Sequence, residues 1–239
     1  ESVRADDAVR PALLQRPRWP SQCLICRAWP AATLCGACVA RFGAAQSRCA
    51  CCALPVPAGV GRCGACLREP PPFDDCRVAV SYQWPWTRCI ARFKFHQDPG
   101  LARALATLLA HAPGVAAALQ DCELLLPMPL SPARLAERGY NPADLLARQM
   151  APRRVRSDLL LRIRHTPPQR GLARRDRLRN VRGAFAVDPL QVGALQGRRV
   201  ALLDDVMTTG ASLREAAHTL RAAGAAHISA IAFARTDEP

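Results

Sequence analysis

Apolar and polar positions follow two different periods between residue 73 and the end of the chain. Short runs of branched and apolar residues predict β-strands, and apolar residues at three- and four-residue spacing predict helices. Strands are expected at 77–82, 123–126, 158–163, 184–187, 200–203 and 228–234. Helices are expected at 86–96, 100–112 and 142–150, and again after residue 210. This alternation predicts an α/β domain built on a mostly parallel sheet with helices on both faces.

The first 72 residues are marked by cysteines instead of a periodic pattern. The chain has 12 cysteines, and eight of them form four Cys-x-x-Cys pairs. Each pair can place two sulfurs about 2.3 Å from one tetrahedral Zn²⁺, so four pairs predict two structural zinc sites. The pairs are expected to combine in sequence, with a crossed arrangement as the alternative. The predicted ligands are Cys23, Cys26, Cys35, Cys38, Cys49, Cys52, Cys63 and Cys66.

These patterns divide the chain into a zinc module at 1–72 and a larger domain at 73–239. Cys51 stands beside a predicted ligand and could compete with it, although the spacing from Cys49 is too tight for the usual knuckle. The remaining cysteines lie in apolar stretches, where small buried side chains are expected. They are Cys76, Cys89 and Cys122.

The sequence carries no pattern of a membrane span or a signal peptide. No run reaches about 18 uncharged apolar residues, because the most apolar stretch, 101–119, contains Arg103, His111 and Pro113. The chain opens with Glu1 and lacks the charged, apolar and small-residue succession of a leader. We therefore expect a cytoplasmic protein, in a compartment that keeps thiols reduced.

The chain is strongly basic, with a formal net charge of +14 and an isoelectric point of about 10.1. Such a charge favours phosphate-bearing partners, including nucleic acid, although an arginine-rich genome would produce part of the same excess. Lys94 is the only lysine and stands between Phe93 and Phe95, where a cation and aromatic rings could stack bases. The alternative is a helix that buries both rings and exposes Lys94. The candidate nucleic-acid contacts are Lys94, Arg92, Arg170 and Arg174.

The segment 199–213, RVALLDDVMTTGASL, combines an apolar strand, two acids, a loop of small and hydroxyl residues and a helix. Backbone amides and hydroxyls of the loop can converge on a phosphate at the helix amino terminus, and Gly210 permits close approach. Asp204 and Asp205 can accept hydrogen bonds from two ribose hydroxyls and are the candidate catalytic residues. The alternative is an ordinary capped helix with solvated acids. The candidate phosphate-binding residues are Val206, Met207, Thr208, Thr209, Gly210, Ala211 and Ser212.

This segment resembles the phosphoribosyl pyrophosphate signature of type I phosphoribosyltransferases, and from Cys23 to Ala234 the chain resembles the ComF family. The resemblance implies a phosphoribosyltransferase-like domain joined to a zinc module. In the segment 124–141 it implies a pyrophosphate-side loop at 127–130, with Arg134 and Arg138 as phosphate partners. In the segment 164–185 it implies a loop over the pyrophosphate, with Arg175 as a further partner. Pro142 departs from the glutamine usual in the family and suits a helix start.

The ComF resemblance also implies a function. We expect a protein that binds phosphoribosyl pyrophosphate together with Mg²⁺ and handles incoming single-stranded DNA in competence and natural transformation. Competence and DNA-uptake proteins are candidate protein partners. The alternative is an active phosphoribosyltransferase of nucleotide salvage, in which an unidentified acceptor displaces pyrophosphate. No motif identifies that acceptor, so the sequence leaves open whether the protein is an enzyme.

Overall fold

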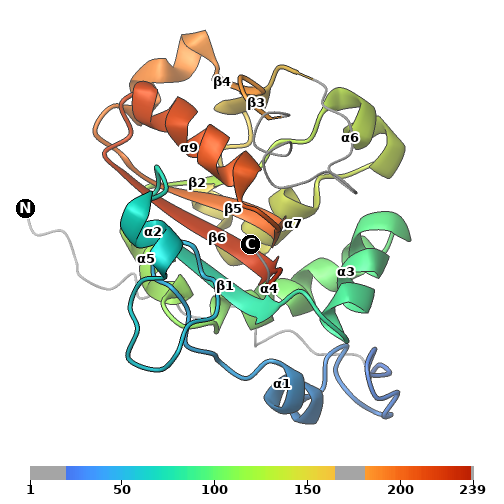
Figure 1. The fold of residues 1–239 in the computed structure, drawn as a ribbon. Coiled ribbons are helices and arrows are strands. Elements are labelled where there is room, and N and C mark those ends of the chain that lie inside the picture. The colour runs from blue at the N-terminus through green and yellow to red at the C-terminus, as the bar shows by residue number, and fades with distance from the viewer. Residues whose placement is uncertain (1–19, 165–180, 238–239) are drawn as a thin grey trace, which may run out of the picture.

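The computed structural model describes residues 20–164 and 181–237, and its centre is a four-stranded parallel sheet (Figure 1). The strands lie in the order β1, β6, β5, β2, and each neighbouring pair is parallel. Their bounds are Asp75–Ser81 for β1, Leu124–Pro127 for β2, Arg199–Met207 for β5 and His227–Arg235 for β6. The two central strands are buried over almost their whole length, as expected for strands covered on both faces.

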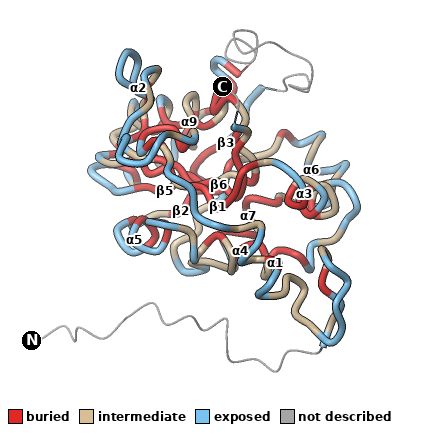
Figure 2. The backbone as a smooth tube through the Cα atoms, turned by 60° about the horizontal axis from the view of Figure 1, so that its bottom comes forward, coloured by how far each residue is buried: buried red, intermediate tan, exposed pale blue. Residues whose placement is uncertain are grey.

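Helices cover the sheet from both sides, and the buried strands form the centre of the molecule (Figure 2). The residues of β5 alternate between the faces: Ala201 and Leu203 pack in one apolar cluster and Leu202 in the other. The first face carries α3 (Trp86–Phe95), α4 (Ala102–Ala110), α5 (Val115–Asp121) and α7 (Pro142–Met150). The second face carries α9 (Ala211–Ala222). The predicted fold class is confirmed in this parallel sheet with helices on both sides.

Two of the predicted strands do not join the main sheet. β3 (Leu160–Arg162) and β4 (Phe185–Val187) pair with each other, antiparallel, in a separate two-stranded sheet. Leu160, Phe185 and Val187 are buried in the cluster that contains α9, whereas Leu161 is exposed. A strand in the centre of the main sheet must be apolar on both faces, because helices cover both. β3 exposes a side chain on one face, which explains why this strand lies outside the main sheet. The two strands therefore pack in the same apolar cluster as α9, on the second face of the main sheet.

The apolar stretch at 100–112 is shorter as a helix than predicted and is followed by an unexpected one. A 3-10 turn (Pro99–Leu101) leads into α4, and Gly114, at φ +75°, leads into α5. No single described helix is long and apolar enough to cross a membrane; the pair 99–110 and 115–121 meets that test only jointly, across a 95° bend. Further helical elements of the larger domain are α6 (Pro132–Arg138) and the 3-10 turns Pro152–Arg154 and Pro189–Leu195.

The cysteine-rich segment contains α1 (Gly36–Phe42) and α2 (Gly64–Arg68), each beginning directly after a cysteine. It packs against the larger domain through specific bonds. The Cys76 amide donates to the Ala50 carbonyl oxygen at 2.8 Å, and the indole of Trp86 donates to the Phe42 carbonyl oxygen at 2.8 Å. The boundary at residue 72 stays a prediction, and these bonds join the two parts across it.

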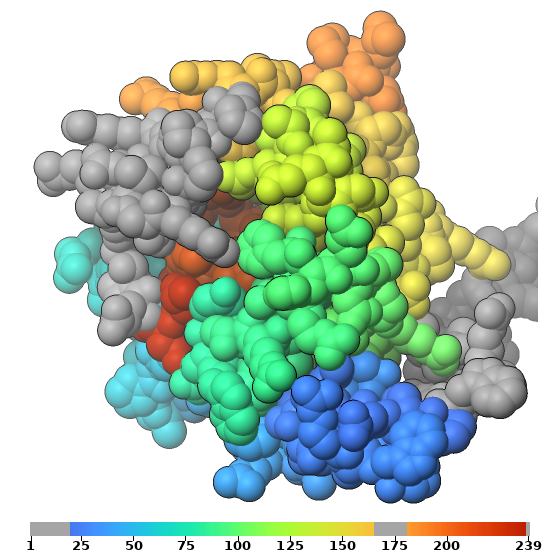
Figure 3. Space-filling model, turned by 90° about the vertical axis from the view of Figure 1, so that its right-hand side faces the viewer, coloured from blue at the N-terminus to red at the C-terminus, as the bar shows by residue number. Residues whose placement is uncertain are grey.

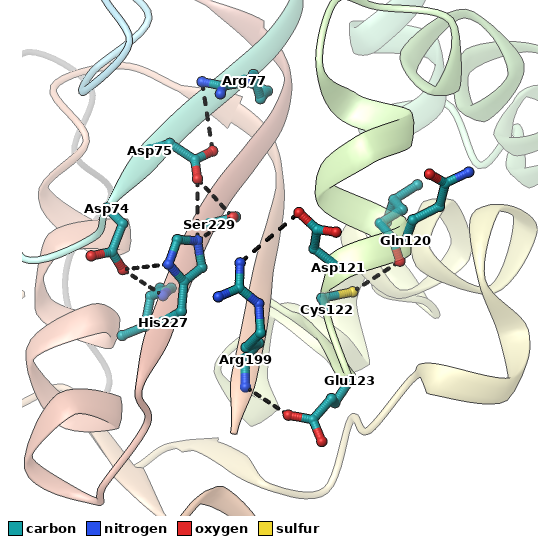
Figure 4. A network of polar contacts seen from close by, with 12 residues as sticks. Asp74, Asp75, Arg77, Gln120, Asp121, Cys122, Glu123, Arg199, His227 and Ser229 are labelled. Atoms are coloured by element: carbon teal, nitrogen blue, oxygen red, sulfur yellow. Dashed lines mark hydrogen bonds and ion pairs between the residues drawn. The ribbon is translucent and has the colours of Figure 1, made fainter. Parts of the chain in front are cut away.

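The amino-terminal edge of the sheet is held by a polar network (Figure 4). The carboxylate of Asp74 accepts a hydrogen bond from the Ile228 amide at 2.7 Å, and Asp75 accepts one from the Ser229 hydroxyl at 2.9 Å. The imidazole of His227 lies between the two acids, 3.5 Å from Asp74 and 3.4 Å from Asp75. The second oxygen of Asp75, Oδ1, has no hydrogen-bond partner among the described residues and lies 3.6 Å from the Arg77 guanidinium. These contacts join the starts of β1 and β6, so we assign this edge a structural role. Ligands of parallel sheets bind at the opposite, carboxyl edge.

Candidate functional site

The two adjacent acids lie inside β5 and not in the loop after it. The sequence predicts a strand that ends at Leu203, but β5 continues to Met207 because it stays paired with β6. β2 pairs with β5 only as far as Leu203. The acids therefore occupy the part of β5 that extends beyond its other neighbour, at the carboxyl edge where a ligand can approach. Since successive strand residues point to opposite faces, Asp204 lies toward the face of α9 and Asp205 toward the face of α3.

Asp205 forms a close ion pair with Lys94. The ammonium nitrogen of Lys94 lies 2.6 Å from the Asp205 Oδ1 atom, and the two side chains are only 18% and 11% exposed. Lys94 is in the last turn of α3. Phe93 is buried but Phe95 is 54% exposed, so the expected alternative of a helix that hides both rings and exposes the lysine is wrong. The structure instead joins the only lysine of the chain to the acid pair, and its role as a nucleic-acid contact stays a prediction.

Asp204 resists ionisation in this arrangement. Burial raises its pKa to about 7, the neighbouring Asp205 charge adds to the rise, and Lys94 opposes it. The Asp205 amide donates a hydrogen bond to the Asp204 Oδ1 atom at 2.8 Å. Two carboxylates at one site cannot both ionise cheaply, which is why the Asp205 charge adds to the rise in the Asp204 pKa. Hydrogen-bond donors from a ligand would favour the charged form.

The turn between β5 and α9 forms a cradle of backbone donors. Among the described residues, none accepts a hydrogen bond from the amides of Thr208, Thr209 and Gly210. The Thr209 hydroxyl accepts one from the Ala211 amide at 3.3 Å. The Arg235 guanidinium, which is buried, donates to the Thr208 carbonyl oxygen at 3.0 Å and so satisfies that acceptor. Free amides at the start of a twelve-residue helix attract an anion.

The turn requires glycine at position 210. It has φ +74°, and a Cβ atom built on it would lie 2.5 Å from the terminal methyl carbon of Met207. We expect Gly210→Ala to lower the free energy of unfolding by about 1–3 kcal/mol, because alanine is strained at positive φ and must displace a buried side chain. Chemical denaturation measures the loss. Gly36→Ala, at a glycine with open space around it, is the control and should change stability little.

The loop after β2 is fixed beside the acids by backbone and amide contacts. The Met128 amide donates to the Leu203 carbonyl oxygen at 2.8 Å, and the Asn141 side chain donates to the Met128 carbonyl oxygen at 3.0 Å. Asn141 also caps α7 by accepting from the Ala143 amide at 3.0 Å, with Pro142 as the first helical residue. Pro142 therefore begins a helix as predicted. Asn141 was a missed positioning residue, although an asparagine directly before a proline at a helix start signals a cap.

The predicted arginines fall into different surroundings. The guanidinium of Arg138 lies over the Phe95 ring at 5.2 Å, and that of Arg92 pairs with Asp98 at 2.7 Å. These contacts are with Phe95 and Asp98 and not with the acid pair of β5. Arg134 is half-buried on α6. Arg162, at the end of β3, was not singled out; burial lowers its pKa, the charge of Arg134 lowers it further and that of Asp204 raises it. Arg170, Arg174 and Arg175 lie outside the described residues.

The space-filling view shows a hollow at this edge (Figure 3). Green atoms of α3 and yellow-green atoms of α6 stand at its rim, and orange to red atoms of the carboxyl-terminal strands are visible at its floor. The acids, Lys94 and the turn before α9 come from elements that meet here. The structure thus brings together an acid pair, a cation and a set of free amides, which suits a ligand with both hydroxyl and phosphate groups.

The cysteines form two four-membered clusters that could each hold a metal ion. Within each cluster the sulfur atoms lie within 4.8 Å of one another, and the pairing is sequential: Cys23, Cys26, Cys35 and Cys38 in one, Cys49, Cys52, Cys63 and Cys66 in the other. Cys51 is buried but belongs to neither cluster. The sequence left sequential and crossed pairing open, and the structure decides for the first.

In each cluster one cysteine has a lowered pKa, Cys23 in the first and Cys49 in the second, whereas burial raises the pKa of Cys38 and Cys52. Burial by itself would raise the pKa of Cys23, but hydrogen bonds from the backbone amides of Cys35, Cys26 and Ile25 lower it to about 6. The second cluster repeats the arrangement: the Cys63 amide donates to the Cys49 sulfur at 3.2 Å. Four thiolate donors in tetrahedral reach are the ligand set of structural zinc. By contrast, burial raises the pKa of Cys76, Cys89 and Cys122, which lie in the apolar core as expected.

Comparison with known proteins gives close relatives by sequence. The chain is 36% identical to "Competence protein F" of Haemophilus influenzae over 177 residues, which cover 71% of this chain and 76% of that protein. It is 32% identical to "DNA utilization protein YhgH" of Escherichia coli strain K12 and 31% identical to that of Salmonella typhimurium, with the same shares covered. No protein-family model matches the chain.

Among solved structures, the chain is similar to one described as the allosteric regulatory enzyme of purine biosynthesis. The TM-score is 0.36 and the identity 18%, over 56% of this chain. The match spans only 25% of that enzyme's chain, and a TM-score of this size carries no conclusion about fold or function.

Proposed function

From the premise that this chain belongs to the ComF family of competence protein F, we propose that it binds phosphoribosyl pyrophosphate at the carboxyl edge of its sheet and acts in the handling of incoming DNA. The family is established by relatives at 36% and 32% identity. The names of these relatives refer to competence and to DNA utilization. The ligand and the form of the DNA are our inference from the residues of this chain.

The observation that carries the ligand is the succession of acids, free amides and helix along one element. Asp204 and Asp205 lie ahead of a turn in which the amides of Thr208, Thr209 and Gly210 have no acceptor within the described part of the chain, and Gly210 gives that turn its shape. Ribose hydroxyls are donors that carboxylates accept, and a 5′-phosphate is an anion that free amides and a helix amino terminus bind. A sugar phosphate fits this order, with its ribose at the strand and its phosphate at the turn.

We propose Zn²⁺ for the cysteine clusters and Mg²⁺ for the pyrophosphate group of the ligand. Each cysteine cluster would hold one structural Zn²⁺, since four sulfurs leave no position for a reactive water. Mg²⁺ would arrive with the pyrophosphate group, whose charge it neutralises. The predicted phosphate partners Arg134 and Arg138 stay candidates, and a cytoplasmic location follows from the proposed role in DNA handling.

The DNA partner is supported by the charge of the chain and by its relatives' names. A net charge of +14 attracts a phosphate backbone, and release of counterions would make the binding salt-dependent. We propose that this partner is single-stranded, because unpaired bases can stack on the exposed ring of Phe95 and on Arg138, whose guanidinium lies over that ring. Other DNA-uptake proteins are further proposed partners.

Calorimetric titration with phosphoribosyl pyrophosphate and Mg²⁺, in the presence and absence of a single-stranded oligonucleotide, tests the proposal. We expect saturable binding of the sugar phosphate, and oligonucleotide binding that weakens steeply as salt rises. Pyrophosphate release on addition of candidate bases would instead indicate an active phosphoribosyltransferase. Absence of sugar phosphate binding at millimolar concentration would contradict the proposed function.

A further inference from the structure

Lys94 is placed differently from the other basic residues of its helix. Arg88 is exposed on α3, and Arg92 is paired with Asp98. Lys94 turns inward and holds Asp205 at 2.6 Å with only 18% of its side chain exposed. A buried ion pair seldom adds net stability, because desolvation of both charges cancels most of their attraction. The pair therefore calls for an explanation in the chemistry of the site.

The end of α3 is held in position by its neighbours on the described chain. The hydroxyl of Tyr140 donates to the Phe93 carbonyl oxygen, and the two rings pack with their centroids 6.0 Å apart. The guanidinium of Arg138 lies over the Phe95 ring. These contacts connect the last turn of α3 to the loop between α6 and α7, on both sides of Lys94 in sequence. The ammonium group is thus fixed beside Asp205, at the carboxyl edge of the sheet.

A ligand that used Asp205 through ribose hydroxyls would displace the ammonium group. Leaving either charge unpaired in so buried a site is strongly unfavourable. A ligand that carries both donors and an anion avoids the cost, since its hydroxyls satisfy Asp205 while its anion receives Lys94. Ribose 5-phosphate places its phosphate at the turn before α9 and offers no second anion. Phosphoribosyl pyrophosphate offers one, at the opposite end of the ribose.

We propose that Lys94 is a binding residue for the pyrophosphate group, held by Asp205 in the free protein and exchanged to the pyrophosphate when ribose hydroxyls replace it at Asp205. This inference rests on the proposed function and deepens it. It assigns Lys94 to the pyrophosphate group, which phosphoribosyl pyrophosphate carries and its hydrolysis product, ribose 5-phosphate, lacks. A lysine suits the exchange: its ammonium is a compact charge on a flexible stem, and it needs no fixed bidentate geometry. The charge of Asp204 also acts on Arg162 of β3, where it opposes the lowering of the Arg162 pKa by burial.

The test compares three probes, each with Mg²⁺: phosphoribosyl pyrophosphate, ribose 5-phosphate and inorganic pyrophosphate. We expect Lys94→Met to weaken binding of the first and third at least tenfold and to change ribose 5-phosphate affinity less than threefold. Lys94→Arg should restore part of the lost affinity. Arg88→Met, on the same helix but exposed, is the matched control and should leave all three affinities unchanged.

The outcomes separate this inference from the proposed function. Equal loss of phosphoribosyl pyrophosphate and ribose 5-phosphate binding would mean that Lys94 only orders Asp205, and unchanged pyrophosphate affinity would also overturn the inference. If the unsubstituted protein bound none of the probes, the proposed function itself would fail. Should Lys94→Met not fold by circular dichroism, Lys94→Gln, which keeps a donor for Asp205, is measured in the same way.

Discussion

Replacing Asp204 and Asp205 together by asparagine should abolish binding of phosphoribosyl pyrophosphate while the chain stays folded. Asparagine keeps the shape of aspartate but removes the charge that strengthens hydrogen bonds from ribose hydroxyls. A hydrogen bond to a charged group contributes about 1.5–3 kcal/mol, so loss of two should weaken affinity at least about 100-fold. Calorimetry measures the affinity and circular dichroism the fold. The control, Asp121→Asn with Glu137→Gln, removes two exposed acids and should bind normally.

The single variant Asp204→Asn adds a stability readout that follows from the raised pKa of Asp204. An acid whose folded pKa lies above its unfolded value destabilises the fold once it must ionise, so the penalty grows from about pH 4 to about pH 7 and stays constant above. Asp204→Asn should therefore melt at or above the temperature of the unsubstituted protein at pH 8, and the difference should vanish near pH 4. A lower melting temperature at pH 8, or unchanged ligand affinity in the double variant, would contradict the assignment.

Removal of the proposed zinc should unfold the cysteine-rich segment. We expect about two zinc ions per chain and about one after Cys49→Ser or Cys26→Ser, because each substitution breaks one cluster. Binding of structural zinc is coupled to folding and is worth about 10–16 kcal/mol in zinc-finger peptides, so each loss should lower the melting temperature strongly. Metal analysis by mass spectrometry and thermal melting with and without a chelator measure the two effects.

Cys51→Ser is the matched control for the zinc experiment. Cys51 directly precedes a cluster residue and is equally buried, yet it belongs to neither cluster. This variant should keep about two ions and lose little stability, since only one small side chain changes. A stoichiometry of one ion in the unsubstituted protein would mean that one cluster does not bind zinc, and loss of an ion in Cys51→Ser would mean that the ligand set is wrong.

Several elements could be predicted from the sequence because their signals are local. The helix at 142–150 was predicted with its exact bounds from apolar spacing and a proline start. The helix at 86–96 was predicted to within one residue of its end. The four cysteine pairs and the paired acids before a Thr-Thr-Gly turn are also contiguous patterns. Such features depend on neighbours along the chain, so no knowledge of the fold is needed to recognise them.

Other features could not be predicted because they depend on which segments meet. The separate pairing of β3 with β4, and the extension of β5 to Met207, depend on the partner strands available in space. The same holds for the sequential combination of cysteine pairs. Arg162 was missed because the charge of Asp204 acts on it across two separate sheets, and no spacing rule in the sequence joins residues on different sheets.

The sequence by itself determined the α/β alternation, the cysteine-rich segment and the succession of acids, turn and helix, since each is written in consecutive residues. Only the tertiary structure decided that the two acids occupy a strand and lie toward opposite faces of the sheet, and that Lys94 reaches one of them. The physical reason is distance: Lys94 and Asp205 are more than a hundred residues apart in the chain, and the packing of α3 beside the carboxyl end of β5 brings their charges to 2.6 Å.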